Sequence, residues 1–506
     1  MSQSSGRPSC SCSHQSQHHW LADSRVDAMM AKTKEEQLLL ESIDQTRLEV
    51  SPTLDPKRRS KLGQFMTPGR IASFMAGMFD TLPPDVRLLD AGAGMGALTA
   101  AFVAEALRRD VRPASIDVTC YEVDEQLASI LDGTLAACAD QCTGAGVTFT
   151  SRVVRDDYIL QSAEPLLREQ RAYNCAILNP PYGKINQTSE WRLGLRSLGI
   201  ETVNLYTAFV AVALGQMEDG GEIVAITPRS FCNGSYYEPF RRILLAGSAI
   251  ANLHVFESRR SSFKDDDVLQ ENMIFRVRKG AEQGDVALST DETEARNVPF
   301  SDIVRPSDRH AFIRLPVSGN DLADSVQALP CVLADLGIKV STGRVVDFRT
   351  RDNLRKEPGA DTVPLIYPQH FHDGGIQWPI PNFRKHNALA DNDDTAKLIT
   401  PAGIFVLTKR FTAKEEKRRL VATIYDGERA GFENHLNYFH ENGEGLPLDL
   451  AKGLAAFLNS DAVDQYFRIF SGHTQVNATD LRNLHYPSRD QLEALGRGDT
   501  TMDDLL

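Results

Sequence analysis

The sequence predicts an α/β fold, in which a mostly parallel β-sheet with helices on both faces is followed by a separate α+β domain. Three observations support this prediction. Short apolar runs near residues 87, 116 and 173 alternate with stretches of helical periodicity, which is typical of strand–helix–strand units. A glycine-rich turn follows the first run, as in doubly wound sheets. Beyond about residue 305 the chain changes to short β-like runs with many aromatic and scattered basic residues.

The composition is that of a soluble globular protein. The 506 residues are 42% hydrophobic and 24% charged, and a chain of this length suits about two to four domains. No apolar run reaches the roughly 20 residues that span a membrane, and the polar N-terminus lacks a signal-peptide core. The eight cysteines have no regular spacing, which indicates a reducing, cytoplasmic location. With a net charge of -13, any nucleic-acid partner must be bound by a local patch.

Changes in composition predict five segments. Residues 1–30 are rich in Ser, Gln and His and are expected to be a disordered lead. Residues 31–55 have helical spacing and many charges, so we expect a helix that packs on the domain behind it. Residues 56–280 carry the predicted sheet, the polar and acidic residues 281–305 are interpreted as a linker, and residues 306–506 form the second domain.

The N-terminal lead contains five residues of the types that bind metals, Cys10, Cys12, His14, His18 and His19. Their spacing fits no structural zinc pattern. We therefore expect no metal site in this protein.

The first predicted strand runs into a turn that contains Asp90, Gly92, Gly94 and Gly96. Glycine lets the backbone turn sharply and approach a ligand closely. The spacing G-x-G-x-G differs from the dinucleotide-binding pattern G-x-G-x-x-G. Asp90 at the strand end would be out of place beside a pyrophosphate, and it suits a ligand with a positive group, such as a sulfonium amino acid.

Two further carboxylates follow the next predicted strands. Glu122 ends the second strand, close to where a ribose-binding carboxylate belongs in such folds. The alternative for Glu122 is an ordinary acidic loop residue. Asp157, which an aromatic residue follows, ends the third strand segment and can hold the amino group and edge of an adenine.

The segment Gly-Gln-Phe-Met-Thr-Pro at residues 63–68 precedes a stretch of helical periodicity. Thr67 is predicted to be the helix N-cap, with Pro68 at the first helical position. The alternative interpretation is a capped amphipathic helix with no further role.

The apolar run at residues 173–178 predicts a buried strand, and the sequence Asn179-Pro180-Pro181-Tyr182 ends it because proline cannot donate to a β-ladder. Asn179 is therefore expected at the carboxyl end of a strand, where open α/β sheets bind ligands. An amide oxygen and a backbone carbonyl can both accept hydrogen bonds from an NH₂ group, and Tyr182 can stack on the ring that carries it. The pattern predicts a site for methylating a planar amine. The alternative is a strand followed by an ordinary Pro-Pro loop.

Read in order, Gly-Gln-Phe-Met-Thr-Pro, Asp-Ala-Gly-Ala-Gly-Met-Gly, Tyr-Glu-Val-Asp, Asp-Asp-Tyr and Asn-Pro-Pro-Tyr resemble the motifs of N6-adenine DNA methyltransferases of the γ arrangement, such as the TaqI type. The resemblance covers about residues 60–280. It implies a class I, Rossmann-like methyltransferase domain that uses S-adenosylmethionine (AdoMet) as its cofactor. It also implies that the α+β domain behind it reads the DNA target.

The same resemblance implies roles for single residues. Asn179 and Pro180 would accept the two N6 protons of an adenine that is flipped out of the duplex. In TaqI-like enzymes an aromatic side chain before the last strand pair stacks on that adenine, and Phe263 stands in this place; its alternative is a buried loop anchor. The implied catalytic residues are Asn179, Pro180, Pro181, Tyr182 and Phe263, and the implied cofactor-binding residues are Thr67, Pro68, Asp90, Gly92, Gly94, Glu122, Asp157 and Asn179.

The second domain carries the predicted DNA contacts. A basic patch follows the strand-like run 405–411, and the polar loop 472–482 offers side chains to base edges and phosphates. The alternative for the basic patch is a solvated helix face. The loop is similar to the C-terminal end of type II modification methylases of the PstI/BsuBI kind, which implies the target CTGCAG. The expected DNA-binding residues are Lys409, Arg410, Lys417, Arg418, His473, Gln475, Asn477 and Arg482.

These features together predict a site-specific adenine DNA methyltransferase that modifies double-stranded DNA as part of a restriction-modification system. We expect a monomer, with a cognate restriction endonuclease as a functional rather than a physical partner. Two alternatives stay open. Enzymes that methylate RNA adenine or a protein glutamine share Asn-Pro-Pro-Tyr but usually lack a C-terminal domain of about 200 residues. A catalytically idle DNA-binding module would keep the fold without the chemistry.

Overall fold

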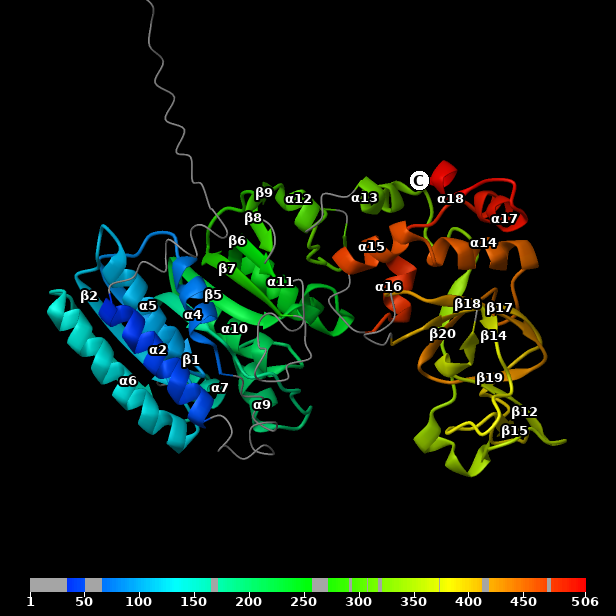
Figure 1. Cartoon of the computed structure of the whole chain (residues 1–506), viewed down its shortest axis with the longest axis horizontal. Helices are drawn as coiled ribbons and strands as arrows, with labels where there is room; N and C mark the ends of the chain where they lie inside the picture. The colour runs from blue at the N-terminus through cyan, green and yellow to red at the C-terminus, as the bar shows by residue number, and fades with distance from the viewer. Residues whose placement is uncertain are drawn as a thin grey trace, which may run out of the picture.

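A computed structural model describes the chain in ten stretches, namely residues 34–50, 66–164, 172–256, 272–290, 294–306, 308–316, 321–372, 374–411, 418–470 and 475–506. Figure 1 shows the sheet of the N-terminal part and its covering helices in blue to green, and the C-terminal part in yellow to red. None of the helices within these stretches combines the length and apolar character needed to cross a bilayer.

The N-terminal part is built on a nine-stranded sheet with the order β3-β2-β1-β4-β5-β7-β6-β8-β9. Strands β1 to β5 are parallel, and β7 runs antiparallel between β5 and β6. The chain moves from β1 outward to β3 and then returns to β4 on the other side of β1, which opens a crevice at the carboxyl ends of these two strands. The strands are β1 Asp85–Ala91, β2 Ser115–Tyr121, β3 Thr148–Val154, β4 Tyr173–Leu178, β5 Met217–Pro228, β6 Ser248–Val255, β7 Asn272–Lys279, β8 Val286–Thr290 and β9 Arg296–Val298.

Helices cover both faces of this sheet and form one hydrophobic core on each. The apolar side chains of α2, α4, α5 and α6 pack on one face, and those of α7, α9, α10 and α11 pack on the other. The expected α/β fold is therefore confirmed. The helices are α2 Lys34–Val50, α4 Gly69–Gly77, α5 Ala97–Arg108, α6 Glu125–Gly144, α7 Tyr158–Ala163, α9 Glu190–Ser197, α10 Leu205–Gln216 and α11 Glu238–Gly247.

In the segment interpreted as a linker, residues 281–305, the residues that the structure describes instead extend the sheet. Strand β8 pairs in parallel with β6, and β9 pairs with β8. Val286, Leu288 and Val298 are buried in the core, while the acidic residues between and around them account for the polar composition. The interpretation as a linker was wrong because composition averages over the alternation of inward and outward side chains that makes a strand.

The C-terminal part combines small sheets with a layer of helices (Figure 1). A four-stranded sheet has the order β10-β20-β17-β18, and a five-stranded sheet has the order β11-β15-β12-β19-β16. The elements of this part and of the connection before it are α12 Phe300–Ile303, α13 Asp321–Ala328, β10 Lys339–Thr342, β11 Leu354–Arg355, β12 Thr362–Ile366, β13 Phe371–His372, β14 Gly375–Ile376, β15 Ala388–Ala390, β16 Ile399–Thr400, β17 Gly403–Lys409, β18 Ala422–Gly427, β19 Ala430–Phe432, β20 Leu436–His440, α14 Leu448–Leu458, α15 Asp461–Phe470, α16 Ala478–Asn483, α17 Arg489–Arg497 and α18 Met502–Leu505.

Two glycines let α14 and α17 lie unusually close to each other. A Cβ atom on Gly453 would lie 1.7 Å from the carbonyl oxygen of Leu492, and one on Gly496 would lie 1.8 Å from that of Asp449. No side chain fits at either position, so this pair of helices depends on both glycines.

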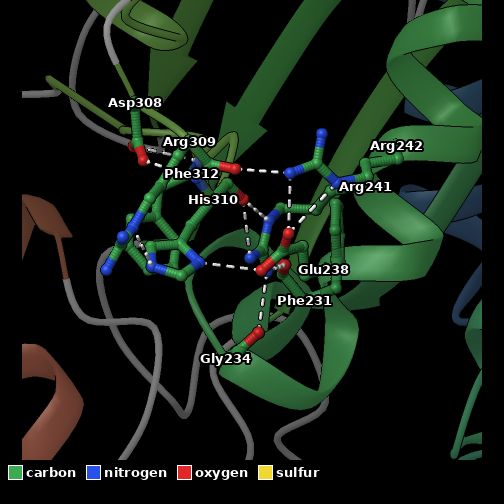
Figure 2. A network of polar contacts seen from close by, with 9 residues as sticks. All are labelled: Phe231, Gly234, Glu238, Arg241, Arg242, Asp308, Arg309, His310 and Phe312. Carbon is green, nitrogen blue, oxygen red and sulfur yellow. Dashed lines mark hydrogen bonds and ion pairs between the residues drawn. The ribbon is translucent and has the colours of Figure 1, made fainter.

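A buried arginine ties the chain that follows the sheet back to α11 (Figure 2). Arg241 donates from Nη1 to the carbonyl oxygens of Phe231 and Gly234, both at 2.8 Å, and from Nε and Nη2 to that of His310, at 3.1 and 2.9 Å. Its guanidinium carbon lies 4.9 Å from the ring centroid of Phe312. Burial lowers the pKa of Arg241 to about 10, so it remains charged at neutral pH. These contacts fix the loop after β5, and Ser230 of that loop is hydrogen-bonded to Tyr206, whose ring packs against that of Tyr182.

Candidate cofactor and catalytic site

A cavity lies at the carboxyl ends of β1 to β4, at the point where the strand order reverses. Its walls come from the glycine turn after β1, the ends of β2 and β3, the turn after β4, and the helices α2 and α10. Several residues predicted to bind a cofactor share this cavity. The predicted residues in its walls are Thr67, Gly92, Gly94, Glu122, Asp157 and Asn179.

The glycine turn needs its glycines for conformation and for close approach. Gly92 and Gly96 have φ of +79° and +85°, a region that other residues rarely adopt. A Cβ atom on Gly92 would lie 3.8 Å from Pro181 and 3.9 Å from the carbonyl oxygen of Asn179. The turn after β1 is thus in van der Waals contact with the turn after β4.

Glu122 is held at the cavity wall by the backbone. Its Oε2 accepts a hydrogen bond from the N–H of Gly94 at 2.8 Å, and its Oε1 accepts one from the N–H of Asp124 at 2.8 Å. Burial raises the pKa of Glu122. A carboxylate oxygen has two lone pairs and can accept more than one hydrogen bond.

Asp157 occupies the cavity wall beside an indole that the sequence did not single out. Its Oδ1 caps α7 by accepting from the N–H of Leu160 at 3.0 Å, and its Oδ2 accepts from Nε1 of Trp191 at 2.7 Å. Trp191 itself lines the cavity and adds a planar surface near the carboxylate. The composition of its segment carries no signal that marks Trp191 as a pocket residue.

Asp90 lies beneath the glycine turn and not in the cavity wall. It is fully buried, and its Oδ2 accepts a hydrogen bond from the hydroxyl of Thr99 at 2.7 Å. Burial raises the pKa of Asp90 to about 7. Its Oδ1 has no hydrogen-bond partner among the residues that the structure describes.

The turn after β4 presents Asn179 with a defined orientation. Its Nδ2 donates to the hydroxyl oxygen of Thr67 at 2.9 Å, and both residues are buried. Because the amide nitrogen faces Thr67, the oxygen Oδ1 faces the other way, towards the hydroxyl of Tyr182 at 3.5 Å. Residues 112 positions apart in the chain therefore set which end of the Asn179 amide is offered to a substrate.

The structure corrects the local prediction for Thr67 and Pro68. Helix α4 begins at Gly69, and Pro68 rather than Thr67 occupies the N-cap position, where no side chain caps the helix. The hydroxyl of Thr67 is engaged by Asn179 instead. Pro68 does not line the cavity.

Aromatic rings extend from the turn after β4 towards the loop after β5. The ring of Tyr182 lies 6.1 Å from that of Tyr206, which lies 5.9 Å from that of Tyr237. The hydroxyl of Tyr206 forms a 2.7 Å hydrogen bond with that of Ser230. Phe263, the predicted second stacking residue, lies outside the residues that the structure describes.

Comparison with known proteins identifies the family. The model of the Eco57I restriction-modification methylase family matches residues 138–263. The type II methyltransferase M.PstI of Providencia stuartii is 47% identical over 89% of this chain and 92% of its own length. M.BsuBI of Bacillus subtilis is 46% identical over 91% of this chain and 94% of its own length. This chain belongs to the type II methyltransferase family. It is therefore a modification methyltransferase of the kind that restriction-modification systems use, and the expected family is confirmed.

Solved structures support the same fold for this type II methyltransferase. The DrdV–DNA complex superposes with a TM-score of 0.53 at 13% identity, covering 93% of this chain and 60% of DrdV. The restriction-modification enzyme LlaBIII bound to DNA gives a TM-score of 0.50 at 11% identity, covering 94% of this chain and 42% of LlaBIII. At these identities the likeness concerns the fold alone.

The predicted DNA-binding residues of the methyltransferase fall into two groups. Arg410, Gln475 and Asn477 lie together, because Nη2 of Arg410 donates to Oδ1 of Asn477 at 3.4 Å and Phe411 forms a β-bridge with Gln475. Burial lowers the pKa of Arg410, and the charges of Glu433 and of Tyr236, on the loop after β5, oppose this shift.

The other predicted DNA-binding residues are dispersed. Arg418 forms an ion pair with Asp461 on α15 at 2.7 Å, and Arg482 donates to the carbonyl oxygen of Val340 at 3.1 Å. The ammonium of Lys409 lies 5.5 Å from the ring centroid of Phe371. Lys417, His473 and the N-terminal cysteines and histidines lie outside the described residues.

Proposed function

We propose that this type II methyltransferase transfers the methyl group of AdoMet to N6 of an adenine in double-stranded DNA. The observation that carries the proposal is the orientation of Asn179. Its Nδ2 is bound to Thr67, so Oδ1 is the acceptor end of the amide, and the backbone carbonyl of Pro180, the next residue, would be the second acceptor. Two acceptors at the end of a strand match the two N–H groups of an exocyclic amine.

The cavity fits the parts of AdoMet in order along the sheet edge. Asp157 follows β3, Glu122 follows β2, the glycine turn follows β1 and Asn179 follows β4, and all four line the same cavity. Asp157 and Trp191 would hold the adenine part, and Glu122 would accept hydrogen bonds from the ribose hydroxyls. When bound, AdoMet supplies an electrophilic methyl group on a sulfonium. Asp90, buried below the turn with Oδ1 unpaired among the described residues, would stabilise the positive charge.

The residues of the turn after β4 would perform the chemistry on the substrate side. The lone pair of N6 is delocalised into the adenine ring and is a poor nucleophile. Acceptance of its two protons by Asn179 Oδ1 and the Pro180 carbonyl would draw the nitrogen towards tetrahedral geometry and stabilise the developing positive charge. The methylated nitrogen then loses a proton to solvent, so no general base is required.

The adenine must leave the helix to reach this cavity. Base flipping costs roughly a few kcal/mol, and stacking on an aromatic face returns about 1–3 kcal/mol. Tyr182 is half-buried next to Asn179 and offers one such face. Phe263 is proposed as the second face on the basis of the sequence.

The C-terminal part is proposed to read the target. Arg410, Gln475 and Asn477 lie together and would contact the duplex. Arg418 and Arg482 bind other residues of the C-terminal part, so we propose that they contribute less to DNA binding. Similarity to the PstI/BsuBI kind supports CTGCAG as the target. A restriction endonuclease with the same target would be the functional partner, and the methyltransferase is proposed to act as a monomer.

The test is transfer from labelled AdoMet to unmethylated plasmid DNA, followed by digestion to nucleosides and single-molecule sequencing. N6-methyladenine at one motif is the expected product, and CTGCAG is the expected motif. Plasmid already methylated at CTGCAG is the control and should take up no label. Label on RNA or on a protein glutamine, with none on DNA, would retain the Asn179 chemistry and overturn the assignment of the C-terminal part.

A further inference from the structure

A basic segment of the C-terminal part includes none of the residues predicted to bind DNA. Residues 344–356 contain five cationic side chains and two acidic ones, in a chain whose net charge is -13. All five cations are exposed. The cations are Arg344, Arg349, Arg351, Arg355 and Lys356, and the acids are Asp347 and Asp352. A local excess of positive charge on an acidic protein is the electrostatic signature of an anionic partner.

The fold brings a second basic segment, residues 384–386, against the first. Nζ of Lys356 donates to the carbonyl oxygens of Arg384 and Lys385, at 2.6 and 2.5 Å. The ammonium of Lys385 lies 3.5 Å from Oδ2 of Asp347. Lys356 and Arg384 are 28 residues apart in the chain, so the combined cluster of charge is a product of the tertiary structure.

The charge of this cluster acts on a neighbouring histidine. Burial lowers the pKa of His386, the positive charges of Lys356 and Lys385 lower it further, and Asp347 opposes the shift. Two cations from different segments therefore act together on one side chain, as expected for charges that share a surface.

An exposed aromatic ring lies beside these charges. The side chain of Phe348 is 66% exposed, and it belongs to the short helical turn Asp347–Arg349. The guanidinium carbon of Arg349 lies 5.4 Å from the centroid of the Phe348 ring. An apolar ring beside an arginine is a combination with which proteins enter a groove of DNA.

The position of the cluster separates it from the predicted DNA-binding group at α16. Strand β11, which follows the turn of Phe348, pairs with β15 at the edge of the five-stranded sheet. Figure 1 shows β12 and β15 of this sheet at one end of the C-terminal part, with α14 and α17 at the opposite end and α16 between them. A duplex could thus meet the C-terminal part at two places.

We propose that this basic cluster is a second DNA-binding surface, in which the cations bind phosphates of the duplex and the ring of Phe348 packs against base pairs. Its residues are Phe348, Arg349, Lys356, Arg384 and Lys385. The inference rests on the proposed action on double-stranded DNA. The four cations are exposed or half-exposed and come from two segments, which suits an extended, repeating anion such as a phosphate backbone.

The decisive experiment measures binding of the full chain to a duplex that contains CTGCAG, by fluorescence anisotropy at several salt concentrations. The double variant Arg349→Gln/Arg384→Gln removes two exposed cations that form no ion pair with the residues the structure describes. We expect the Kd to rise roughly tenfold at about 0.1 M salt, and the slope of log K against log salt to fall by about 1.8, or ~0.9 for each phosphate contact. A duplex without CTGCAG should show the same fall in slope, because phosphates carry no sequence information.

The ring of Phe348 is tested separately from the charges. Phe348→Ala should raise the Kd about fivefold or more, because an apolar contact with the bases is lost. The salt slope should stay the same, since the ring carries no charge. Phe348→Trp keeps an aromatic surface and should retain most of the affinity. An unchanged Kd in the alanine variant would overturn the role of the ring.

Lys452→Gln is the matched control for the charges, since Lys452 is an exposed cation of α14, at the other end of the C-terminal part. Its Kd and its salt slope should equal those of the wild type, and urea unfolding midpoints verify that each variant is folded. If the double variant and Lys452→Gln gave the same Kd and slope, the inference would be wrong. Failure of the wild-type protein to bind either duplex would instead refute the proposed function.

Discussion

The hydroxyl of Thr67 accepts a 2.9 Å hydrogen bond from the side-chain amide of Asn179. Thr67 precedes the first helix of the catalytic domain, and Asn179 follows its fourth strand. An asparagine amide has a donor end and an acceptor end of nearly the same shape, so only its partners decide which end meets a substrate. Here the partner is a hydroxyl that is itself buried, which makes the orientation a property of the fold.

The first prediction concerns Asn179 itself. Asn179→Ala removes the side-chain acceptor without touching the glycine turn or Glu122. We expect methyl transfer to fall by roughly 10²–10³-fold or more, with the Kd for AdoMet little changed. Single-turnover kinetics and calorimetry measure the two quantities separately, and near-normal turnover in this variant would refute the proposed chemistry.

The second prediction concerns the orientation of the Asn179 amide. Thr67→Val keeps the shape of the side chain and removes the hydroxyl, so the amide loses the contact that holds its Nδ2. We expect kcat to fall by about tenfold to 10²-fold, since small misplacements of catalytic groups have effects of this size, with a smaller change in KM. Thr67→Ser restores the hydroxyl and should restore kcat. If serine and valine behaved alike, the hydroxyl would have no positioning role.

The third prediction concerns capture of the flipped base. Phe263→Ala should reduce the fluorescence rise of DNA that carries 2-aminopurine at the target adenine, because a stacking face worth about 1–3 kcal/mol is lost. Phe263→Trp keeps a stacking surface and should retain most of the response. The Kd for AdoMet should be the same in both variants. A full fluorescence response in the alanine variant would show that Phe263 does not stack on the flipped adenine and would favour its alternative role as a buried loop anchor.

The fourth prediction is a pH dependence of stability from Asp90, whose pKa burial raises from 3.8 to about 7. The folded protein binds this proton more tightly than the unfolded chain does. The contribution of Asp90 to stability is therefore complete below about pH 4 and is lost as the pH rises to about 7, by at most about 1.4 kcal/mol per pH unit. Asp90→Asn cannot ionise, so its stability relative to wild type should increase from pH 5 to pH 8.

Urea unfolding midpoints at several pH values measure this difference. Asp85→Asn, at the exposed start of the same strand, is the control. A constant gap between Asp90→Asn and wild type across this range would show that the carboxyl of Asp90 does not titrate there.

The fifth prediction tests the junction between α11 and the chain that follows the sheet (Figure 2). Arg241→Met leaves the carbonyl oxygens of Phe231, Gly234 and His310 without their donors in a buried setting. We expect a loss of about 3–5 kcal/mol in the free energy of unfolding. Arg242→Met, whose side chain is 58% exposed, should cost less than about 1 kcal/mol. Equal losses of unfolding free energy in the two variants would show that the buried contacts of Arg241 do not stabilise the fold.

Local patterns in the sequence were sufficient for the sheet and for most of the cavity. The glycine spacing, the acidic residues at strand ends and the two prolines after Asn179 are each local signals, and parallel strands bring their carboxyl ends together in any such fold. The same local reasoning misplaced residues 281–305, because an acidic composition hid the buried positions of β8 and β9. Local reasoning also predicted that Thr67 caps a helix, because no residue near Thr67 in the chain indicates that its hydroxyl binds Asn179.

By itself, the sequence determined the fold class and the family, and it indicated the group proposed to perform the chemistry, because each depends on residues that are adjacent in the chain. Only the tertiary structure decided how these groups are aimed. Thr67 orients Asn179 across 112 residues, and α2 brings Arg47 into a cavity built by strands that follow it. Such contacts depend on how helices pack across the faces and edges of the sheet, and no spacing in the chain records that packing.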